Sequence, residues 1–488
     1  MLLLLLSFLL PFAFSYLLTS CLIETQEGEN QASTILLKVT IALGLTIGLT
    51  SCFFFLWLLL GGTSRGNFEL MEMNFLGVLS LVLFMYSRKK KVNKGIFAVR
   101  PNIKNSVFTK ILLPCTLIAL ITCTIRFIFL SLNHPFGATD ALITWNLRAR
   151  YLFFGIHNWR EYFTEKLLTS SQPDYPLLLP SAIARFWTYL ETDPQFVPIG
   201  VAMIFTFSIV GVIGATVTLL RGTTQGLLAT LVLLGTPFLL EHGATQYADI
   251  PVAFFFVATI AVFCLYDFSN TSTKGVVILA GILAGCAAWT KNEGGLFLFL
   301  VLTIRCFVVI SNKGLKAYMQ EIRYFTLGLL PILIILVAFK IYIAPTTTLF
   351  LSQGVESMVS KLQFQDNYIQ VGLALIKKSL RFGHPGLTLL ILYGLLLGHR
   401  KFPGPLFPFL TPTYLLLGML AGYTFLIITT PFINITYQLA VSLDRLWIQL
   451  WPSIIFLFFL IINTPEEALK KKRSPPLQQE SPPRENFH

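Results

Sequence analysis

Residues 137–180 read GATDALITWNLRARYLFFGIHNWREYFTEKLLTSSQPDYPLLLP and form the longest polar interruption of an otherwise apolar chain. The first part of this stretch predicts a helix over 140–154. Thr139 can cap its N-terminus, Asp140 suits the positive end of the helix dipole, and Gly155 can end it. Because apolar segments flank the stretch, we expect this helix to lie along a membrane surface.

Wound at about 100° per residue, the predicted helix has two faces. The apolar face holds Ala141, Leu142, Trp145, Ala149, Leu152, Phe153 and Ile156. The polar face holds Asp140, Thr144, Arg148 and Tyr151, with Asn146 and Arg150 on its flank. The polar face would present a carboxylate and guanidinium groups above the bilayer, which favours the floor of an active site in a membrane enzyme.

The composition predicts a polytopic membrane protein. Of 488 residues, 55% are hydrophobic and 12% are charged, and the mean hydropathy is +0.72. Soluble domains carry roughly twice that charge. Candidate spans, of which the short ones could be merged or re-entrant, lie near 2–22, 34–60, 74–87, 110–131, 197–220, 225–240, 250–267, 275–290, 294–310, 325–344, 386–398, 411–431 and 446–462. We therefore predict an all-α bundle of about 11–13 spans, with amphipathic juxtamembrane helices in one large outer loop.

Basic clusters orient the chain. Those at 88–95 and 470–473 should be cytoplasmic, because cytoplasmic loops are enriched in lysine and arginine. Counting spans then places the loop 132–196 on the opposite side. The motifs containing Asp140, Asp249, Lys291, Asp444 and Arg445 fall on that same side, as a composite active site requires. We expect a multi-pass protein of the plasma or bacterial inner membrane, with its active site on the extracytoplasmic face.

Three regions are predicted along the chain. Residues 1–95 hold accessory N-terminal spans and a basic cytoplasmic loop, and 96–462 form the catalytic transmembrane region. The tail 463–488 is Pro-rich and charged, which predicts a disordered cytoplasmic segment. The N-terminal apolar run lacks a basic n-region, so we interpret it as a span rather than a cleaved signal.

Two partner classes are not indicated by the sequence. The formal charge of +13 is spread over short clusters beside apolar runs, which does not favour nucleic-acid binding. The seven cysteines and six histidines show no metal-ligand spacing. We assign no cofactor. A divalent metal is compatible with the sequence but not indicated, and we assign no metal ligands.

Asp140 is the predicted catalytic residue. Transfer of a group to a hydroxyl or amine needs a base for the acceptor proton, and a carboxylate can serve. The alternative is an ordinary acid at a helix N-terminus. Arg148 and Arg150 follow at helical spacing and can bind phosphate through paired hydrogen bonds, or can contact lipid headgroups instead.

A second polar motif, WTKNEG at 289–294, interrupts what would be one apolar run. Charges at such a place are costly unless they are paired or face water. We expect Lys291 to reach an anionic group, with Glu293 pairing with it or orienting it and Asn292 beside them. The alternative is a tight outer hairpin between two short spans.

Two further acidic motifs lie at predicted span ends. Asp249 can start a helix, or can line a cavity together with His242. Asp444 and Arg445 should precede the last span, where they form an ion pair or Arg445 contacts phosphate. In the segment 174–180, DYPLLLP, Asp174 and Tyr175 precede prolines that predict a helix starting at Pro180 or Ser181.

With these motifs, the chain resembles the GT-C class of integral membrane glycosyltransferases, in the branch of protein O-mannosyltransferases and the lipid A aminoarabinose transferase. The likeness covers roughly 110–310. It is carried by Thr139-Asp140-Ala141, Asn146 to Tyr151, Asn158-Trp159, Tyr175 to Pro180 and the Gly-rich segment 281–294. The family usually opens with two adjacent acids, whereas here Ala141 follows Asp140. This leaves Asp140 alone as the base and puts a two-carboxylate or metal-assisted scheme in doubt.

The resemblance implies transfer of a sugar, with inversion, from a polyprenyl-phosphate donor to an extracytoplasmic lipid, glycan or protein. Donor-phosphate ligands would be Arg148, Arg150, Lys291 and Arg445. Supporting residues would be Thr144, Tyr151, Asp174, Tyr175, His242, Asp249, Asn292, Glu293 and Asp444.

Two other functions compete with this interpretation. The first is a transporter or lipid-linked-sugar flippase, although transporters usually place polar groups near the bilayer midplane within two related halves. The second is an O-antigen polymerase or ligase, which the acidic helix motif disfavours.

Overall fold

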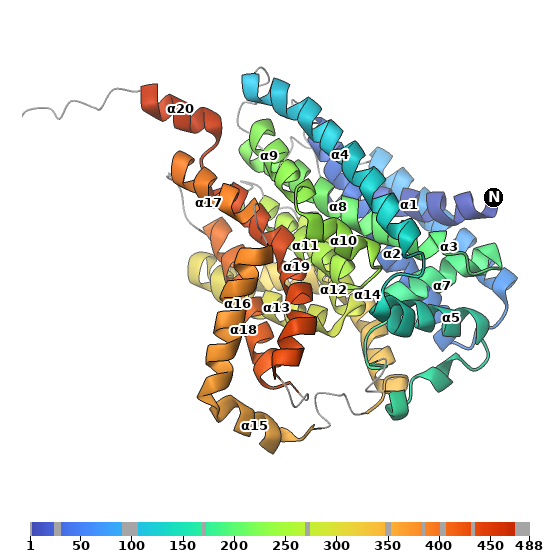
Figure 1. Ribbon diagram of the computed structural model, residues 1–488. Helices are drawn as coiled ribbons and strands as arrows, with labels where there is room; N and C mark the ends of the chain where they lie inside the picture. The colour runs from blue at the N-terminus through green and yellow to red at the C-terminus, as the bar shows by residue number, and fades with distance from the viewer. Residues whose placement is uncertain are drawn as a thin grey trace, which may run out of the picture.

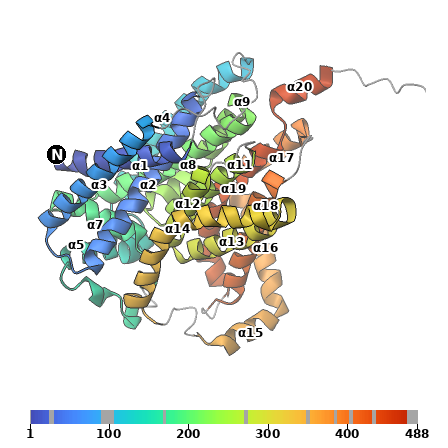
Figure 2. The ribbon, with the colours of Figure 1, turned by 180° about the vertical axis from the view of Figure 1, so that it is seen from behind.

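A computed structural model describes residues 2–23, 31–89, 106–167, 172–268, 274–346, 353–382, 386–400, 407–430 and 435–473. Helices account for nearly all of these residues (Figures 1 and 2). Within the described ranges the β-type pairing is a single isolated bridge between His399 and Ile462. The predicted all-α helix bundle is therefore confirmed.

Ten described helices are long and apolar enough to cross a membrane. They are α1 (Leu2–Leu22), α2 (Gln31–Leu59), α3 (Arg65–Lys89), α4 (Val107–Asn133), α8 (Phe196–Arg221), α11 (Asp249–Phe268), α13 (Asn292–Lys313), α14 (Leu315–Tyr342), α18 (Phe407–Ile428) and α19 (Ile435–Ile461). An eleventh span forms if α9 (Thr223–Leu234) and α10 (Pro237–Ala244), which are bent by 58°, act together. The bend falls at Pro237, which has no backbone N–H to continue a helix.

The remaining helices are shorter. Two apolar ones, α12 (Lys274–Thr290) and α17 (Gly386–Leu397), match the other two predicted segments. Outside the spans lie α5 (Asn146–Phe154), α7 (Leu178–Leu190), α15 (Val355–Gln363), α16 (Gln365–Phe382), α20 (Pro465–Arg473) and short turns of 3-10 or π helix.

The bundle is organised around α11, whose most apolar window is 94% buried, whereas that of α4 is 11% buried. Small residues allow α12 and α14 to pack with their backbones close together. A methyl group added at Gly281 would overlap the backbone of Phe325, and one at Gly328 would overlap Ile278. In a bilayer such close backbone approach is a main source of helix association.

The predicted N-terminal region shares the core of the bundle. Buried side chains of α2, including Leu37, Phe54 and Phe55, belong to the same cluster as the core of α11. The predicted boundary at 95/96, and most of the basic loop 88–95, lie outside the described residues.

The C-terminal helix α20 closes one end of the bundle. Glu467 pairs with Arg221 (3.0 Å), and Glu466 accepts hydrogen bonds from Ser106 (2.7 Å) and Thr224 (2.6 Å). Thr464 and Glu467 bond reciprocally to each other's backbone N–H, at 3.1 and 3.0 Å, as a capping box. The prediction of disorder is therefore wrong for Pro465–Arg473, because capping and ion pairs hold this segment. Figure 1 shows α20 at one end of the molecule and α5 at the other.

Candidate functional site

The polar stretch does form a helix, but not a regular one. It is helical from Thr139, and a π-helical turn at Ala141–Trp145 leads into α5. Gly155 follows the last residue of α5, as predicted. Thr139 is itself helical, and no side-chain cap bond is present, so the predicted N-cap is wrong. Before the helix, Gly137 has φ of 75°, and a methyl group there would collide with Ala141.

The π turn changes which side chains share a face, because it places more residues in a turn than an α-helix does. Arg148 is fully buried and donates to the carbonyl oxygens of Tyr175 (3.1 Å) and Gln172. Burial also lowers the pKa of its guanidinium group. The expectation that Arg148 lies beside Asp140 on an open polar face is therefore wrong, and its guanidinium holds the 172–175 loop.

The other residues of the expected polar face also separate. Thr144 is buried, whereas Tyr151 is exposed with its ring 4.6 Å from that of Tyr162. Arg150 pairs with Asp193 at 3.1 Å. Asn146 is buried and donates to the side chain of Gln246 at 2.8 Å. Of the predicted polar face, Asp140 is the residue that joins the charged network described next.

Asp249, the first residue of α11, is the centre of that network. Its carboxylate is fully buried and accepts hydrogen bonds from Lys291 (2.9 Å), Arg445 (3.0 Å) and Gln449 (2.6 Å). The side chain of Gln449 in turn accepts a hydrogen bond from the hydroxyl of Tyr423. Asp249 of α11 thus holds in place one cation from the connection between α12 and α13 and one from α19.

Arg445 connects Asp249 to Asp140. Its Nη1 lies 2.7 Å from Asp140 Oδ2, and its Nε lies 3.0 Å from Asp249 Oδ2. Tyr247 completes the corner: its ring lies 4.9 Å from the guanidinium, and its hydroxyl accepts a hydrogen bond from the Asp140 backbone N–H at 3.4 Å. The side chains of Asp140 and Arg445 are 32% and 22% exposed, so this corner is the open edge of the network.

The predicted position of Arg445 before the last span is wrong. The helix α19 begins at Ile435, so Asp444 and Arg445 lie within it. Nor does Asp444 pair with Arg445, because Asp444 pairs with Lys378 of α16 at 2.6 Å. Adjacent residues of a helix point in different directions, and these two side chains serve different faces of α19.

Lys291 lies between α12 and α13 in extended conformation. Its side chain is 3% exposed and contacts Asp249 (2.9 Å) and Glu293 (2.7 Å), which confirms the expected pairing with Glu293. Burial by itself would lower the pKa of Lys291, but the two carboxylates raise it above its ordinary value. Lys291 therefore stays charged at neutral pH.

The other side of Lys291 adjoins the Asp174 loop. The amide of Asn292 donates to Asp174 Oδ2 at 2.7 Å. Lys340, near the end of α14, donates to the Asp174 carbonyl oxygen (2.6 Å) and to Asn292 Oδ1 (3.0 Å). The ring of Tyr175 lies 5.8 Å from Lys291 Nζ, and burial raises the pKa of its hydroxyl well above the ordinary value.

The loop ends earlier than expected, since α7 begins at Leu178 rather than at Pro180 or Ser181. Proline is compatible with the first turn of a helix, where its missing N–H has no intrahelical partner. Tyr175 stacks on Trp145 with ring centroids 5.8 Å apart and planes 7° apart. This stacking holds Tyr175, which lies beside Lys291, against the π-helical turn of the polar stretch.

His242 lies beside the network rather than in it. It belongs to α10, and its ring packs on that of Phe238, with centroids 4.2 Å apart. Across the part of the chain that is described, neither ring nitrogen of His242 has a hydrogen-bond partner. Its neighbour Glu241 pairs with Arg126 at 2.8 Å.

Four residues of the site were missed by the sequence reasoning. Gln449 and Tyr423 are polar residues within apolar spans, and Lys340 is a charge near the end of another. Uncompensated polar groups within spans are unusual, and this is the signal that could have singled them out. Tyr247 lies in the connection between α10 and α11, just before Asp249, and carries no comparable signal.

The site therefore combines a buried group of charges with one open corner at Asp140 and Arg445. Such a corner can bind an anion through the guanidinium and accept a proton on the carboxylate. Comparison with models of protein families, with curated proteins and with solved structures found no match to this chain.

Proposed function

We propose that the protein is a membrane glycosyltransferase that moves a sugar from a polyprenyl-phosphate donor to an extracytoplasmic acceptor, with inversion. One observation carries the proposal. Asp140, a partly exposed carboxylate, lies at the open edge of a charge network assembled from segments far apart in the sequence. A base beside fixed cations suits a reaction in which a proton is removed while negative charge develops on a leaving group.

In the proposed reaction, Asp140 takes the proton from the acceptor hydroxyl or amine. The freed electron pair forms a bond to the anomeric carbon on the face opposite the phosphate. The bond between that carbon and the phosphate oxygen breaks, and its electron pair leaves with the polyprenyl phosphate. The configuration at the anomeric carbon inverts, because attack and departure take place on opposite faces.

Arg445 is the cation placed to meet the donor phosphate. Its side chain is partly exposed and its guanidinium touches Asp140, so the base and the leaving group would share one corner. Lys291 is almost fully buried on the far side of Asp249. It would raise the positive potential at the donor phosphate without contacting the phosphate directly. Arg148 is not assigned to the phosphate, because it is bonded to loop carbonyls. Arg150, paired with Asp193, lies outside the network.

A lipid-linked-sugar flippase or transporter is the alternative that one observation favours. The apolar pair α9 and α10 is bent by 58°, and broken helices are typical of transporters. The charged residues Asp249, Lys291 and Arg445 of the candidate site do not belong to this bent pair of helices but to other segments. A flippase would move the labelled lipid between leaflets of a vesicle without releasing polyprenyl phosphate.

The deciding experiment is transfer from a radiolabelled polyprenyl-phosphate sugar by protein reconstituted in vesicles. Asp140→Asn should lower transfer by about a hundredfold or more, and Asp193→Asn is the matched control. Both aspartates are about one-third exposed and each pairs with an arginine, but only Asp140 contacts the network. Equal transfer by the two variants would refute Asp140 as the base. Transbilayer movement of label without transfer would favour the flippase.

A further inference from the structure

The connection between α10 and α11, residues 245–248, lies against the segment that carries Asp140. The carbonyl oxygen of Thr245 accepts a hydrogen bond from the backbone N–H of Ala138 at 3.1 Å. The hydroxyl of Tyr247 accepts one from the backbone N–H of Asp140 at 3.4 Å. Both donors are backbone groups, so these bonds fix the course of the chain at Asp140 and just before it.

Gln246, between these two residues, ties both ends of the same segment. Its side-chain oxygen accepts a hydrogen bond from the amide of Asn146 at 2.8 Å, and its side-chain amide donates to the carbonyl oxygen of Pro135 at 3.1 Å. The amide of Asn146 also donates to the carbonyl oxygen of Phe136 at 3.2 Å. Gln246 is 4% exposed, so little water competes for these bonds. One side chain therefore bridges the entry and the exit of the stretch that carries Asp140.

The backbone of Gln246 is in the left-handed region, with φ of 60°. Left-handed backbone is uncommon for a residue with a side chain, and it persists where the surroundings hold it in place. Across from it, a methyl group at Gly137 would lie 2.7 Å from the Thr245 carbonyl oxygen and 3.2 Å from Gln246 Cβ. The two stretches of chain thus touch, and added bulk at Gly137 would separate them.

The connection also leads directly into the charge network. Asp249, which follows it, accepts a hydrogen bond from Arg445, and another nitrogen of the same guanidinium pairs with Asp140. Arg445 belongs to α19, far from Asp140 in the sequence. Because residues 245–249 hold the backbone at Asp140 on one side and Arg445 on the other, they set how the carboxylate and the guanidinium meet.

We propose that the α10–α11 connection positions the base against the cation, and that Gln246 is its positioning residue. This inference rests on the proposed function. The side-chain bonds of Gln246 go to Asn146 and Pro135, so it would act through the segment that carries Asp140 and not on the substrate. Loss of the bridge should lower turnover and spare donor affinity, because Arg445 keeps its bond to Asp249.

Two substitutions remove the bridge without opposing the left-handed backbone. Gln246→Gly removes the side chain, and Gln246→Asn shortens it so that it cannot span both partners. Glycine and asparagine both tolerate positive φ. Glu191→Gly is the matched control, because Glu191 also has positive φ, 57°, but is exposed at the end of α7. If relief of backbone strain were the whole effect, the two glycine variants would behave alike.

The first measurement is hydrogen–deuterium exchange of the full-length protein in detergent micelles, read by mass spectrometry of its peptides. Both Gln246 variants should raise the exchange rate of amides in 138–146 about tenfold, since the bonds that hold Ala138 and Asp140 would open more often. The amides of α11 should stay protected. Glu191→Gly should leave 138–146 unchanged. This measurement needs no substrate.

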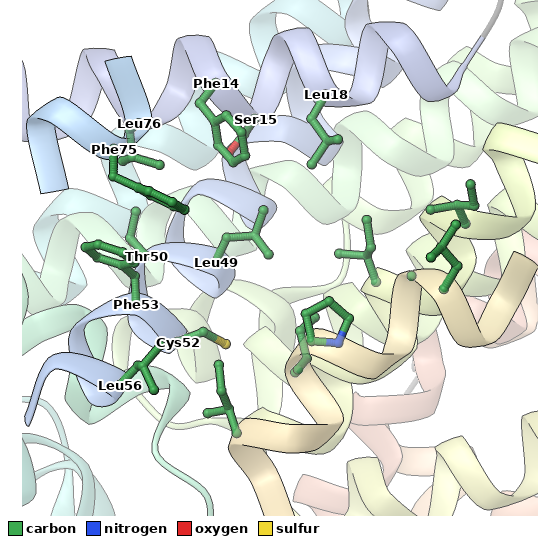
Figure 3. A pocket seen from close by; sticks show the side chains of 17 residues that line it. Phe14, Ser15, Leu18, Leu49, Thr50, Cys52, Phe53, Leu56, Phe75 and Leu76 are labelled. Atoms are coloured by element: carbon green, nitrogen blue, oxygen red, sulfur yellow. The ribbon is translucent and has the colours of Figure 1, made fainter. Parts of the chain in front are cut away.

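Leu76→Ala is the control for a general loss of stability. Leu76 is a buried side chain of α3 that lines a cavity of about 300 Å³ between α1, α2 and α3 on one side and α12 and α14 on the other (Figure 3). Among the described residues, this lining includes none of 135–146 or 245–248. Truncation there should lower stability by enlarging the cavity, without a selective rise of exchange in 138–146.

The second measurement is transfer from the radiolabelled donor, with donor affinity measured by competition with polyprenyl phosphate. Both Gln246 variants should lower kcat about tenfold to a hundredfold, because a small displacement of a reacting group costs that much. Donor affinity should stay near that of the wild type. In an Asp140→Asn background, Gln246→Asn should have little further effect on kcat, since it acts through that carboxylate.

Unchanged exchange in 138–146, or equal effects of Gln246→Gly and Glu191→Gly, would overturn the proposal, and so would loosened 138–146 with normal transfer. Selective loosening in a protein whose wild type transfers no sugar would support the hold of the connection on the segment and leave the transferase proposal without support. Unchanged exchange in a protein whose transfer is lost in Asp140→Asn would refute the role of Gln246 and leave the transferase proposal standing.

Discussion

Replacing Asp249 by asparagine should destabilise the fold more than any other single change at the site. Asp249 is fully buried and accepts hydrogen bonds from Lys291, Arg445 and Gln449. Removing one partner of a buried ion pair costs about 3–5 kcal/mol, because a charge remains in a poorly solvated place. Here Lys291 keeps Glu293 and Arg445 keeps Asp140, which should hold the loss near the lower figure, about 3 kcal/mol.

The matched comparison is Asp140→Asn, which removes a carboxylate from the same arginine. Both side chains of that pair are partly exposed, so the loss should stay below about 1 kcal/mol. The free energy of unfolding is measured by denaturant titration in mixed micelles, with tryptophan fluorescence as the signal. Asp249→Asn should be less stable than Asp140→Asn by about 2 kcal/mol.

A second substitution tests the reason for the loss. Lys291→Met, introduced into Asp249→Asn, removes one of the stranded cations and should restore about 1 kcal/mol or more. If the two losses simply add, the buried charge is not their cause. If Asp249→Asn is as stable as Asp140→Asn, the network does not support the fold, and the reasoning fails at its first step.

The remaining predictions concern separate parts of the molecule. Asp140→Asn should lower transfer by about a hundredfold or more while donor binding, measured by competition, stays near normal; unaltered transfer would place the base elsewhere. Arg148→Ala should chiefly lower thermal stability, because it releases the 172–175 loop, and a stable but inactive variant would contradict this. Thr464→Ala should cost about 1 kcal/mol of helix capping, seen as faster proteolysis of α20, and unchanged proteolysis would argue against the cap. The pKa of Lys291 is raised in the folded protein, so the stability it contributes should be complete below the pKa of the unfolded chain, about 10.4. That contribution should fade as the pH rises through the higher pKa of the folded state. Lys291→Met should remove this decline in the free energy of unfolding at alkaline pH.

Much of the bundle could be predicted because span length and apolar composition are local properties of a sequence. The grouping of the charged residues on one side of the membrane could be predicted as well. Counting spans from the basic clusters placed Asp140, Asp249, Lys291 and Arg445 on one side, and the structure joins these four by ion pairs. Positions along the membrane normal follow from the number of crossings, so no knowledge of packing is needed.

The details of the site depend on packing, and there the predictions failed. A regular helix was assumed at 140–154, but the π turn moved Arg148 into the interior. The polar residues at the start of α19 suggested a loop, yet the helix extends to Ile435 by packing against α16 and α18. In α20 the residues of the capping box stand in the sequence, but the prediction of disorder rested on the charged, Pro-rich composition alone and did not use them.

The guanidinium of Arg445 forms ion pairs with two carboxylates, those of Asp140 and Asp249. While the pair with Asp140 is intact, this carboxylate is less able to accept a proton. An anion that binds the guanidinium competes with Asp140 first, because Asp249 keeps two other donors, Lys291 and Gln449, whereas Asp140 is paired with Arg445. The arrival of one negative group would thus loosen another at the same corner. A site built this way exposes its proton acceptor in step with anion binding and keeps the acceptor neutralised at rest.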